Sequence, residues 1–487
     1  MLSYTNKIFG GYMKHLKKLL IVMSAFLAVV AFTITSKADA AFSSTASCRL
    51  SDAKTIVFSA SLSGIPASDD GIVYLYQMGP YDYSLTSSCT CIGQTTLSTS
   101  PSVAVSLYDA TGTSRICQKF AMAVLQGGKP VLITGAKYVT NPELAATHTR
   151  AVQKVGFVEP TSKMVLYRIG ETNVAAIARD NYSTAVIVNK ADSTLINPKS
   201  KGSDSHPVSK KMYYMFNASN AAGVKKLQST MEYFAANTNV DEFIIGNEVN
   251  SRIWNYTKSM DWNEYVQEYA QAFRVCYNAI KSQNANAKVY ISLDQMWNMD
   301  NAVGTSKYYE YMDGLDFVLL FNNFIAAEGN IDWGLCFHPY PNPMLYAKFW
   351  DMSGCTNGDV YAAQVAAGQV VTFQNLTVMT GTMALSAMRS PTGKVRDIIL
   401  PEIGITQAQG VEVQAAAMMA CYQAAYNNPY ISRIYFHRIN EGGKSNFSTT
   451  GISEQVYNAL ISNQASQYND WALNYIGISS WSQIVSY

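Results

Sequence analysis

Two glutamates end two strand-like apolar runs, Glu248 at the end of 243–248 and Glu402 at the end of 398–402. Each run leads into a polar or Gly-containing loop, which predicts that both carboxylates lie where a buried strand emerges. A charge at such a place is costly unless it is paired or faces a cleft. Glycosidic bond cleavage needs two carboxyl groups of this kind, an acid/base and a nucleophile or second base. Salt bridges would explain either glutamate alone, whereas the pair with its neighbours favours catalysis.

Strands alternate with helices from about residue 160, which predicts parallel βα units and the α/β class. The expected helices are 221–236, 261–282, 307–321, 376–389, 411–427 and 454–462. The expected strands are 184–189, 212–217, 243–248, 289–293, 333–338, 398–402 and 432–437.

This pattern predicts a (β/α)8 TIM-type barrel over residues 160–487, although it supplies seven strands where such a barrel has eight. The polar stretch between 189 and 212 is too short for a helix, a strand and a second helix. Either a strand lies in 164–169, or the barrel is incomplete near its second strand.

Residues able to do chemistry end six of the expected strands. In parallel α/β barrels the active site forms at the C-terminal ends of the strands. Chance would place one or two such residues there rather than six, so we expect a site at this rim. The residues are Asn217, Asn247 with Glu248, Asp294, His338 with Tyr340, Glu402, and His437 with Arg438.

The motif Gly246-Asn247-Glu248, His338-x-Tyr340 two strands later and Glu402 on the next strand resemble the clan A glycoside hydrolases. With the runs Asn-Glu-Val-Asn (247–250) and His-Pro-Tyr-Pro (338–341), the chain is most similar to an uncharacterised bacterial family of predicted glycoside-hydrolase-like barrels, over roughly 160–460. The resemblance implies a retaining mechanism, with Glu248 as acid/base and Glu402 as nucleophile. The sequence itself leaves retention and inversion open, because it does not give the carboxyl separation.

The rim residues near the two glutamates have both a binding and a structural interpretation. Asn247 would donate to a sugar 2-hydroxyl, or it caps its own loop. Tyr340 would donate to Glu402, while His338 would bind substrate or orient Glu248.

Substrate contacts are also predicted further along the rim. Arg438 would bind an acidic sugar or stabilise carboxylates, or it forms a structural pair with Glu402 or Glu441. Tryptophans in loops after strands are either stacking platforms for sugar rings or core residues; these are Trp254, Trp297 and Trp350. The predicted substrate-binding set is Asn247, His338, Tyr340, Asn217, Trp254, Trp297, His437 and Arg438.

The N-terminus has the pattern of an export signal. Lys14, Lys17 and Lys18 precede the apolar run 19–34, and Ala-Asp-Ala at 38–40 is a small-residue cleavage pattern. We therefore expect residues 1–40 to be a signal peptide, with Met13 as an alternative start, and the mature protein to be secreted or held at the cell surface. A retained anchor is the alternative. No later apolar run reaches the roughly 18 residues of a membrane span.

Residues 41–150 are rich in Ser, Thr and Gly, and short alternating runs predict a small β-sandwich. The runs are 54–61, 71–77, 103–107, 119–125 and 131–133. After export, disulfides could persist here, and three pairings of four cysteines are open: these are Cys48, Cys89, Cys91 and Cys117. Buried thiols are expected at Cys276, Cys336 and Cys421.

Charge and composition indicate which binding partners to expect. The net charge of +2 gives no reason to expect nucleic acid or an acidic membrane. Cys89-x-Cys91 lacks the further ligands of a zinc site, so we expect no metal and no cofactor. The 32 tyrosines offer flat faces for sugar rings, or they build a large core.

The sequence therefore predicts an exported glycoside hydrolase acting on a β-linked oligo- or polysaccharide. The alternative is a carbohydrate-binding or cell-surface protein on a degenerate hydrolase barrel. A serine esterase and a zinc peptidase are disfavoured because no Gly-x-Ser-x-Gly and no His-Glu-x-x-His occurs. Sugar identity, exo or endo action and oligomeric state stay open.

Overall fold

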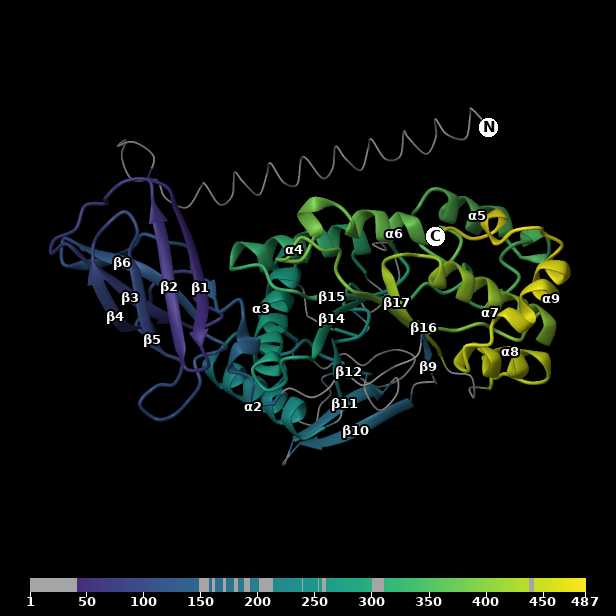
Figure 1. Cartoon of the computed structure of the whole chain (residues 1–487), viewed down its shortest axis with the longest axis horizontal. Coiled ribbons are helices and arrows are strands. Elements are labelled where there is room, and N and C mark those ends of the chain that lie inside the picture. The colour runs from purple at the N-terminus through teal and green to yellow at the C-terminus, as the bar shows by residue number, and fades with distance from the viewer. Residues whose placement is uncertain are drawn as a thin grey trace.

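The chain forms an all-β region followed by an α/β region, as seen in a computed structural model (Figure 1). The expected signal peptide at residues 1–40 and the expected site residue Arg438 lie outside the described residues. The structure describes residues 42–148, 157–159, 163–169, 172–178, 183–187, 193–200, 213–238, 240–252, 254–255, 260–299, 311–437 and 442–487.

The N-terminal region consists of two antiparallel sheets, with strand orders β1-β2-β5 and β4-β3-β6-β7 and with β8 on β6. The runs expected from alternation are strands, and in β2 every second residue is buried, namely Ile56, Phe58, Ala60 and Leu62. That the two sheets form a separate sandwich domain stays a prediction. The strands are β1 (Ser44–Asp52), β2 (Thr55–Leu62), β3 (Ile72–Met78), β4 (Thr90–Thr96), β5 (Ser102–Ser106), β6 (Lys119–Gln126), β7 (Lys129–Leu132) and β8 (Lys137–Tyr138).

The β region packs on the helices α3 (Trp262–Lys281) and α4 (Gly314–Ala327) (Figure 1). The buried Asn278 amide of α3 donates to the carbonyls of Ile116 (2.8 Å) and Val139 (3.2 Å). Buried Lys119 pairs with Glu328, just after α4, at 3.0 Å. These contacts fix the β region on the side of the α/β region.

The eight cysteines all lie within the described residues, and none of them forms a disulfide. Cys48 and Cys117 are buried, and burial raises the pKa of both thiols. None of the three pairings open to the N-terminal cysteines is formed here. Cys276, Cys336 and Cys421 are buried thiols, as expected.

The α/β region is built on one nine-stranded sheet with the order β10-β11-β12-β13-β14-β15-β16-β17-β9. Neighbouring strands from β12 through β17 to β9 are parallel, which confirms the α/β class, while β10, β11 and β12 pair antiparallel. The strands are β9 (Val158–Glu159), β10 (Lys163–Ile169), β11 (Thr172–Ala178), β12 (Ser183–Ile187), β13 (Glu242–Ile245), β14 (Lys288–Leu293), β15 (Gly334–Phe337), β16 (Ile398–Ile403) and β17 (Ile431–Phe436).

The part of the expected barrel before β13 differs from the prediction. Residues 212–217 were expected to form a strand, but from Tyr213 onward this segment makes only isolated bridges, such as Phe216 with Ile196. The alternative strand at 164–169 exists as β10, yet it belongs to an antiparallel pair and supplies no parallel barrel strand. Within the described residues no pairing joins β10 to β9, so the sheet is open there.

The sheet nevertheless encloses side chains on one face. A small buried cluster takes one residue from the segment before α2 and one from each of four neighbouring strands, and it is separate from the main core. Neighbouring parallel strands place such residues side by side on one face, and their burial shows that this face is covered. The members are Tyr213, Ile244, Tyr290, Cys336 and Ile399.

The helices largely follow the sequence pattern. Asp261 caps α3 by accepting from the Glu264 N–H. Of the helix expected over 307–321, residues 307–310 lie outside the described residues; α4 begins at Gly314, where Asp313 caps it, and the helix expected over 376–389 ends at Met383. No helix in the described part of the chain is long and apolar enough to cross a membrane. The remaining helices are α2 (Ala221–Asn237), α5 (Gly358–Ala366), α6 (Leu376–Met383), α7 (Val411–Tyr426), α8 (Ile452–Ile461) and α9 (Ser466–Ile476).

Candidate active site

Glu248 lies in a sharp turn at the C-terminal end of β13. Its φ of 43° and the φ of 84° at Gly246 are both in the left-handed region. A side chain at Gly246 would collide with Val249, because an added Cβ would lie 2.5 Å from its Cγ1. Left-handed backbone at a non-glycine residue costs of order 1–3 kcal/mol and occurs often at functional sites. The turn is held by Tyr269, which donates to the Ile245 carbonyl at 2.6 Å.

His338 follows β15 and lies between the two glutamates. Its Nδ1 is 2.9 Å from Oε1 of Glu248 and 3.8 Å from Oε2 of Glu402, and its side chain is fully buried. The glutamate side chains are partly accessible, with Glu248 19% and Glu402 12% exposed. The structure therefore brings together three residues that the sequence predicted for the site.

Glu402 on β16 has partners from two neighbouring strand ends. Tyr340 donates its hydroxyl to Oε1 at 2.8 Å, and His437 Nε2 lies 3.8 Å from the same oxygen. Gly404 permits this approach, because an added Cβ would lie 2.6 Å from the Tyr340 ring. The interaction expected between Tyr340 and Glu402 is thus present in the structure.

Glu248, His338 and Glu402 also have donor types that bind divalent cations, and one ligand atom from each lies within 4.8 Å of the others. His338 and Glu248, however, are close enough to satisfy each other directly, at 2.9 Å. Two ligands held about 2.1 Å from one ion also lie about 3 Å apart, so this separation fits both a hydrogen-bonded pair and two metal ligands.

Asn247 is 1% exposed, and neither its amide nitrogen nor its amide oxygen has a hydrogen-bond partner among the described residues. An unpaired buried amide is costly, and in native structures such groups call for an explanation. This unpaired amide belongs to the residue directly before Glu248.

Asp294 at the end of β14 was among the strand-end residues expected at this rim, but no catalytic or binding role was predicted for it. Its Oδ1 accepts from Asn250 Nδ2 (2.8 Å) and from the Met296 N–H (2.9 Å). Burial, with the negative charge of Glu248 as a second cause, raises the pKa of Asp294 to about 7. Its position directly after a strand was the signal in the sequence.

Two residues predicted to bind substrate are buried in contacts with the rest of the protein. Trp297 is 1% exposed and packs edge-on against Phe337, so the prediction of a stacking platform there is wrong. Asn217 is also buried. Its amide nitrogen donates to the Thr194 carbonyl and its amide oxygen accepts from the Ser219 N–H, so the side chain stabilises the local backbone.

The other tryptophans divide between the two interpretations. Trp254 is half-buried and lies 4.9 Å from the ring of Tyr213, at the small inner cluster. Trp350 packs against Phe349 and the main core. Trp254 is therefore the remaining candidate among them for a contact with ligand.

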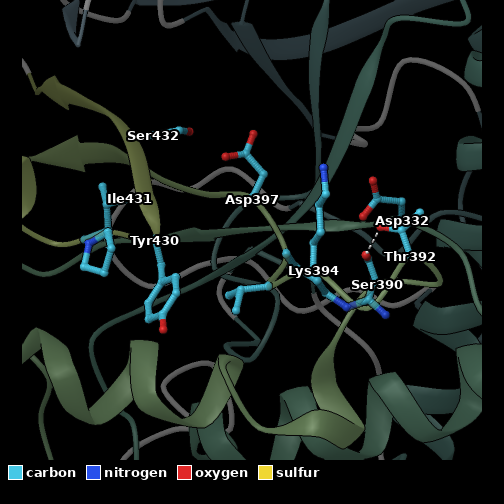
Figure 2. A pocket seen from close by; sticks show the side chains of 11 residues that line it. Asp332, Ser390, Thr392, Lys394, Asp397, Tyr430, Ile431 and Ser432 are labelled. Atoms are coloured by element: carbon cyan, nitrogen blue, oxygen red, sulfur yellow. Dashed lines mark hydrogen bonds between the residues drawn. The ribbon is translucent and has the colours of Figure 1, made fainter.

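A separate pocket of about 300 Å³ opens at the other end of the strands. Figure 2 shows Asp332, Lys394 and Asp397 around it, where β16 and β17 begin. Asp397 is already bonded to Lys288 and Tyr290. In parallel α/β folds this end of the strands serves stability, so we place the candidate site at Glu248 and Glu402.

The fold and site define an α/β protein with two close carboxylates at the C-terminal ends of parallel strands. The chain belongs to a family of unknown function, DUF5722, whose model matches residues 162–484. A comparison with curated proteins finds no match.

Solved structures give weak likenesses. A family 39 glycoside hydrolase from the gut symbiont Bacteroides cellulosilyticus WH2 is 11% identical, over 83% of this chain and 79% of its own, with a TM-score of 0.32. A beta-glucosidase from Thermotoga maritima is 9% identical over 50% and 68%, with a TM-score of 0.28. An FMN-binding beta-glucuronidase from Facaelibacterium prausnitzii L2-6 is 10% identical over 86% and 61%, with a TM-score of 0.20. TM-scores this low carry no argument about function.

Proposed function

We propose that this protein is an exported glycoside hydrolase that cleaves a β-linked oligo- or polysaccharide with retention of configuration. The observation that carries the proposal is the approach of Glu248 and Glu402, which each have a carboxylate oxygen within 4.8 Å of the other. Retaining enzymes hold the two carboxyl groups about 5–5.5 Å apart, and inverting enzymes hold them about 6.5–9.5 Å apart. The short separation supports retention.

In the first step, protonated Glu248 gives its proton to the glycosidic oxygen while the Glu402 carboxylate attacks the anomeric carbon. The bond to the leaving sugar breaks, and a glycosyl ester forms on Glu402. In the second step, ionised Glu248 takes a proton from water, whose oxygen attacks the same carbon and releases Glu402. The hydrogen bond from Tyr340 to Oε1 of Glu402 holds the carboxylate in place for the attack.

Asn247 is the proposed contact to the sugar 2-hydroxyl. Its buried amide has no hydrogen-bond partner among the described residues, which supports this role because a bound hydroxyl can both donate and accept. Trp254, His437 and Arg438 are proposed as further substrate contacts. No cofactor or metal enters the proposed reaction.

The barrel and the export also remain proposals. The run of parallel neighbours from β12 to β9 and the enclosed cluster around Tyr290 support a (β/α)8-type barrel that is incomplete near its second strand. The lysines and the apolar run before residue 40 support a cleaved signal peptide and a secreted or cell-surface protein.

A carbohydrate-binding protein without turnover is the second candidate. The open sheet between β10 and β9 in the described chain favours it, because a distorted rim would lose substrate contacts. The close carboxylate pair opposes it.

Release of reducing sugar from a panel of β- and α-linked glycans tests the proposal. Wild type and Glu402→Gln are compared, with Glu412→Gln, an exposed glutamate in the first turn of α7, as the matched control. We expect release by wild type and the control but not by Glu402→Gln. Glycan binding without release by any of the three would support the binding protein instead. Equal activity in Glu402→Gln would remove the nucleophile assignment.

A further inference from the structure

Ser292 on β14 belongs to a ring of hydrogen bonds that begins and ends at Glu248. The Glu248 backbone N–H donates to Ser292 Oγ at 3.2 Å, and this oxygen lies 3.3 Å from His338 Nε2. The other nitrogen of the same ring, Nδ1, lies 2.9 Å from Oε1 of Glu248. Ser292 and His338 are both fully buried, so water has no access to replace these contacts.

The directions of these hydrogen bonds follow from donor and acceptor chemistry. An ionised carboxylate only accepts, so Nδ1 carries the hydrogen when Glu248 is ionised. A neutral imidazole then has an unprotonated Nε2, which needs a donor. The Ser292 oxygen already accepts from the Glu248 N–H, and its single hydroxyl hydrogen is free to point at Nε2. This assignment satisfies every member of the ring.

We propose that Ser292 is a positioning residue that donates to His338 Nε2 and so holds the Nδ1–H of His338 between the two carboxylates. In this orientation Nδ1 donates its hydrogen to Oε1 of Glu248, which lies 2.9 Å away. Oε2 of Glu402 lies 3.8 Å from the same nitrogen. Through its backbone contact the same hydroxyl also steadies the left-handed turn at Glu248. One serine thus connects the turn, the imidazole and the carboxylate.

The part of this inference that concerns turnover rests on the proposed function. Removal of a neutral hydrogen bond costs about 1 kcal/mol, so Ser292→Ala should lower kcat about fivefold with KM nearly unchanged. The hydrogen-bond arrangement itself does not depend on any activity. It can be measured even if no substrate is found.

The test is the ¹⁵N resonance of the imidazole nitrogens in the full chain labelled at histidine. The chain has only five histidines, and His338→Gln identifies the signals of His338. The spectra are recorded at mildly alkaline pH. The matched control is Ser453→Ala, which removes another fully buried serine hydroxyl, one that bonds Thr450 at the start of α8.

We expect wild-type His338 to show a protonated Nδ1 and an unprotonated, hydrogen-bonded Nε2. In Ser292→Ala the Nε2 resonance should move downfield toward the value of a free imine nitrogen, whereas Ser453→Ala should leave it in place. A protonated Nε2 in wild type, or an Nε2 resonance unmoved by Ser292→Ala, would overturn the proposal. If wild type releases no sugar but the Nε2 shift is seen, the proposed function fails while the role of Ser292 stands.

Discussion

Tyr340 and Glu402 come from adjacent strand ends and share a hydrogen bond of 2.8 Å, in which the phenol donates to Oε1 of the carboxylate. The Tyr340 ring is held from the other side by Gly404 and Phe447, with a distance of 6.2 Å between the Tyr340 and Phe447 ring centroids. The carboxylate is therefore fixed in rotation by a phenol that is itself fixed by packing. Fixed geometry of this kind is what a nucleophile needs.

Tyr340→Phe removes this bond and leaves the ring in place. A hydrogen bond to a charged group is worth about 1.5–3 kcal/mol, so kcat/KM should fall roughly 10- to 150-fold. Steady-state kinetics on the best glycan of the panel measure the change. The matched control is Tyr346→Phe, on the same loop, whose hydroxyl donates to the Asp351 carbonyl. Equal losses in both variants would mean that the loop, rather than the bond to Glu402, was disturbed.

Glu248→Gln should remove protonation of the leaving group. General acid catalysis contributes about 10²–10⁴-fold, and a substrate whose leaving group needs no proton escapes most of this loss. Rates on an aryl glycoside with an acidic phenol are compared with rates on the natural linkage. The glycan rate should collapse while formation of the glycosyl-enzyme from the aryl glycoside survives. Similar losses on both substrates would argue against Glu248 as the acid.

The strand ends that carry the site could be predicted from the sequence, because apolar runs followed by a polar residue mark where a buried strand emerges. Glu248, His338, Tyr340 and Glu402 meet as that reasoning expected. The pairing before β13 could not be predicted, since the sequence does not say that β12 pairs directly with β13. Strand order is set by tertiary packing.

Trp297 shows a second limit of prediction from the sequence, which concerns burial. Its position just after a strand suggested an exposed ring, yet the chain turns back and Trp297 N–H donates to the Gln369 carbonyl at 2.9 Å. Its ring packs edge-on against Phe337, so contacts distant along the sequence bury it. The left-handed backbone of Glu248 was equally invisible, because no local motif requires it.

Asp294→Asn should flatten the pH dependence of stability. Because the folded pKa of Asp294 is raised to about 7, from 3.8, the folded chain holds a proton there that the unfolded chain has released. The free energy of unfolding therefore falls as pH rises from about 4 to about 7. Asparagine keeps an acceptor for Asn250 and Met296 but cannot ionise. Urea unfolding at about pH 5 and about pH 8 should show a smaller decline in the variant than in wild type.

The control for this measurement is Asp109→Asn, in the N-terminal β region. A hydrogen bond from Thr111 lowers the pKa of Asp109, so this group is ionised in both states across the same pH window. Its replacement should leave the slope as in wild type. A decline in Asp294→Asn as steep as that of wild type would show that Asp294 does not hold the extra proton.

Arg433→Met should destabilise the fold by about 3–5 kcal/mol, because it leaves a buried charge without its partner. Arg433 Nη1 lies 2.6 Å from Oε1 of Glu242, and the other carboxylate oxygen accepts from Tyr435 at 3.1 Å. Burial raises the pKa of Glu242, and Arg433 opposes that shift. Without Arg433 the carboxylate should take up a proton more readily, so the loss should shrink as pH falls. Urea unfolding at two pH values measures it, and adding Glu242→Gln should recover part of the stability. A loss independent of pH and unrelieved by the second change would mean that the arginine stem, rather than its charge, stabilises the strands.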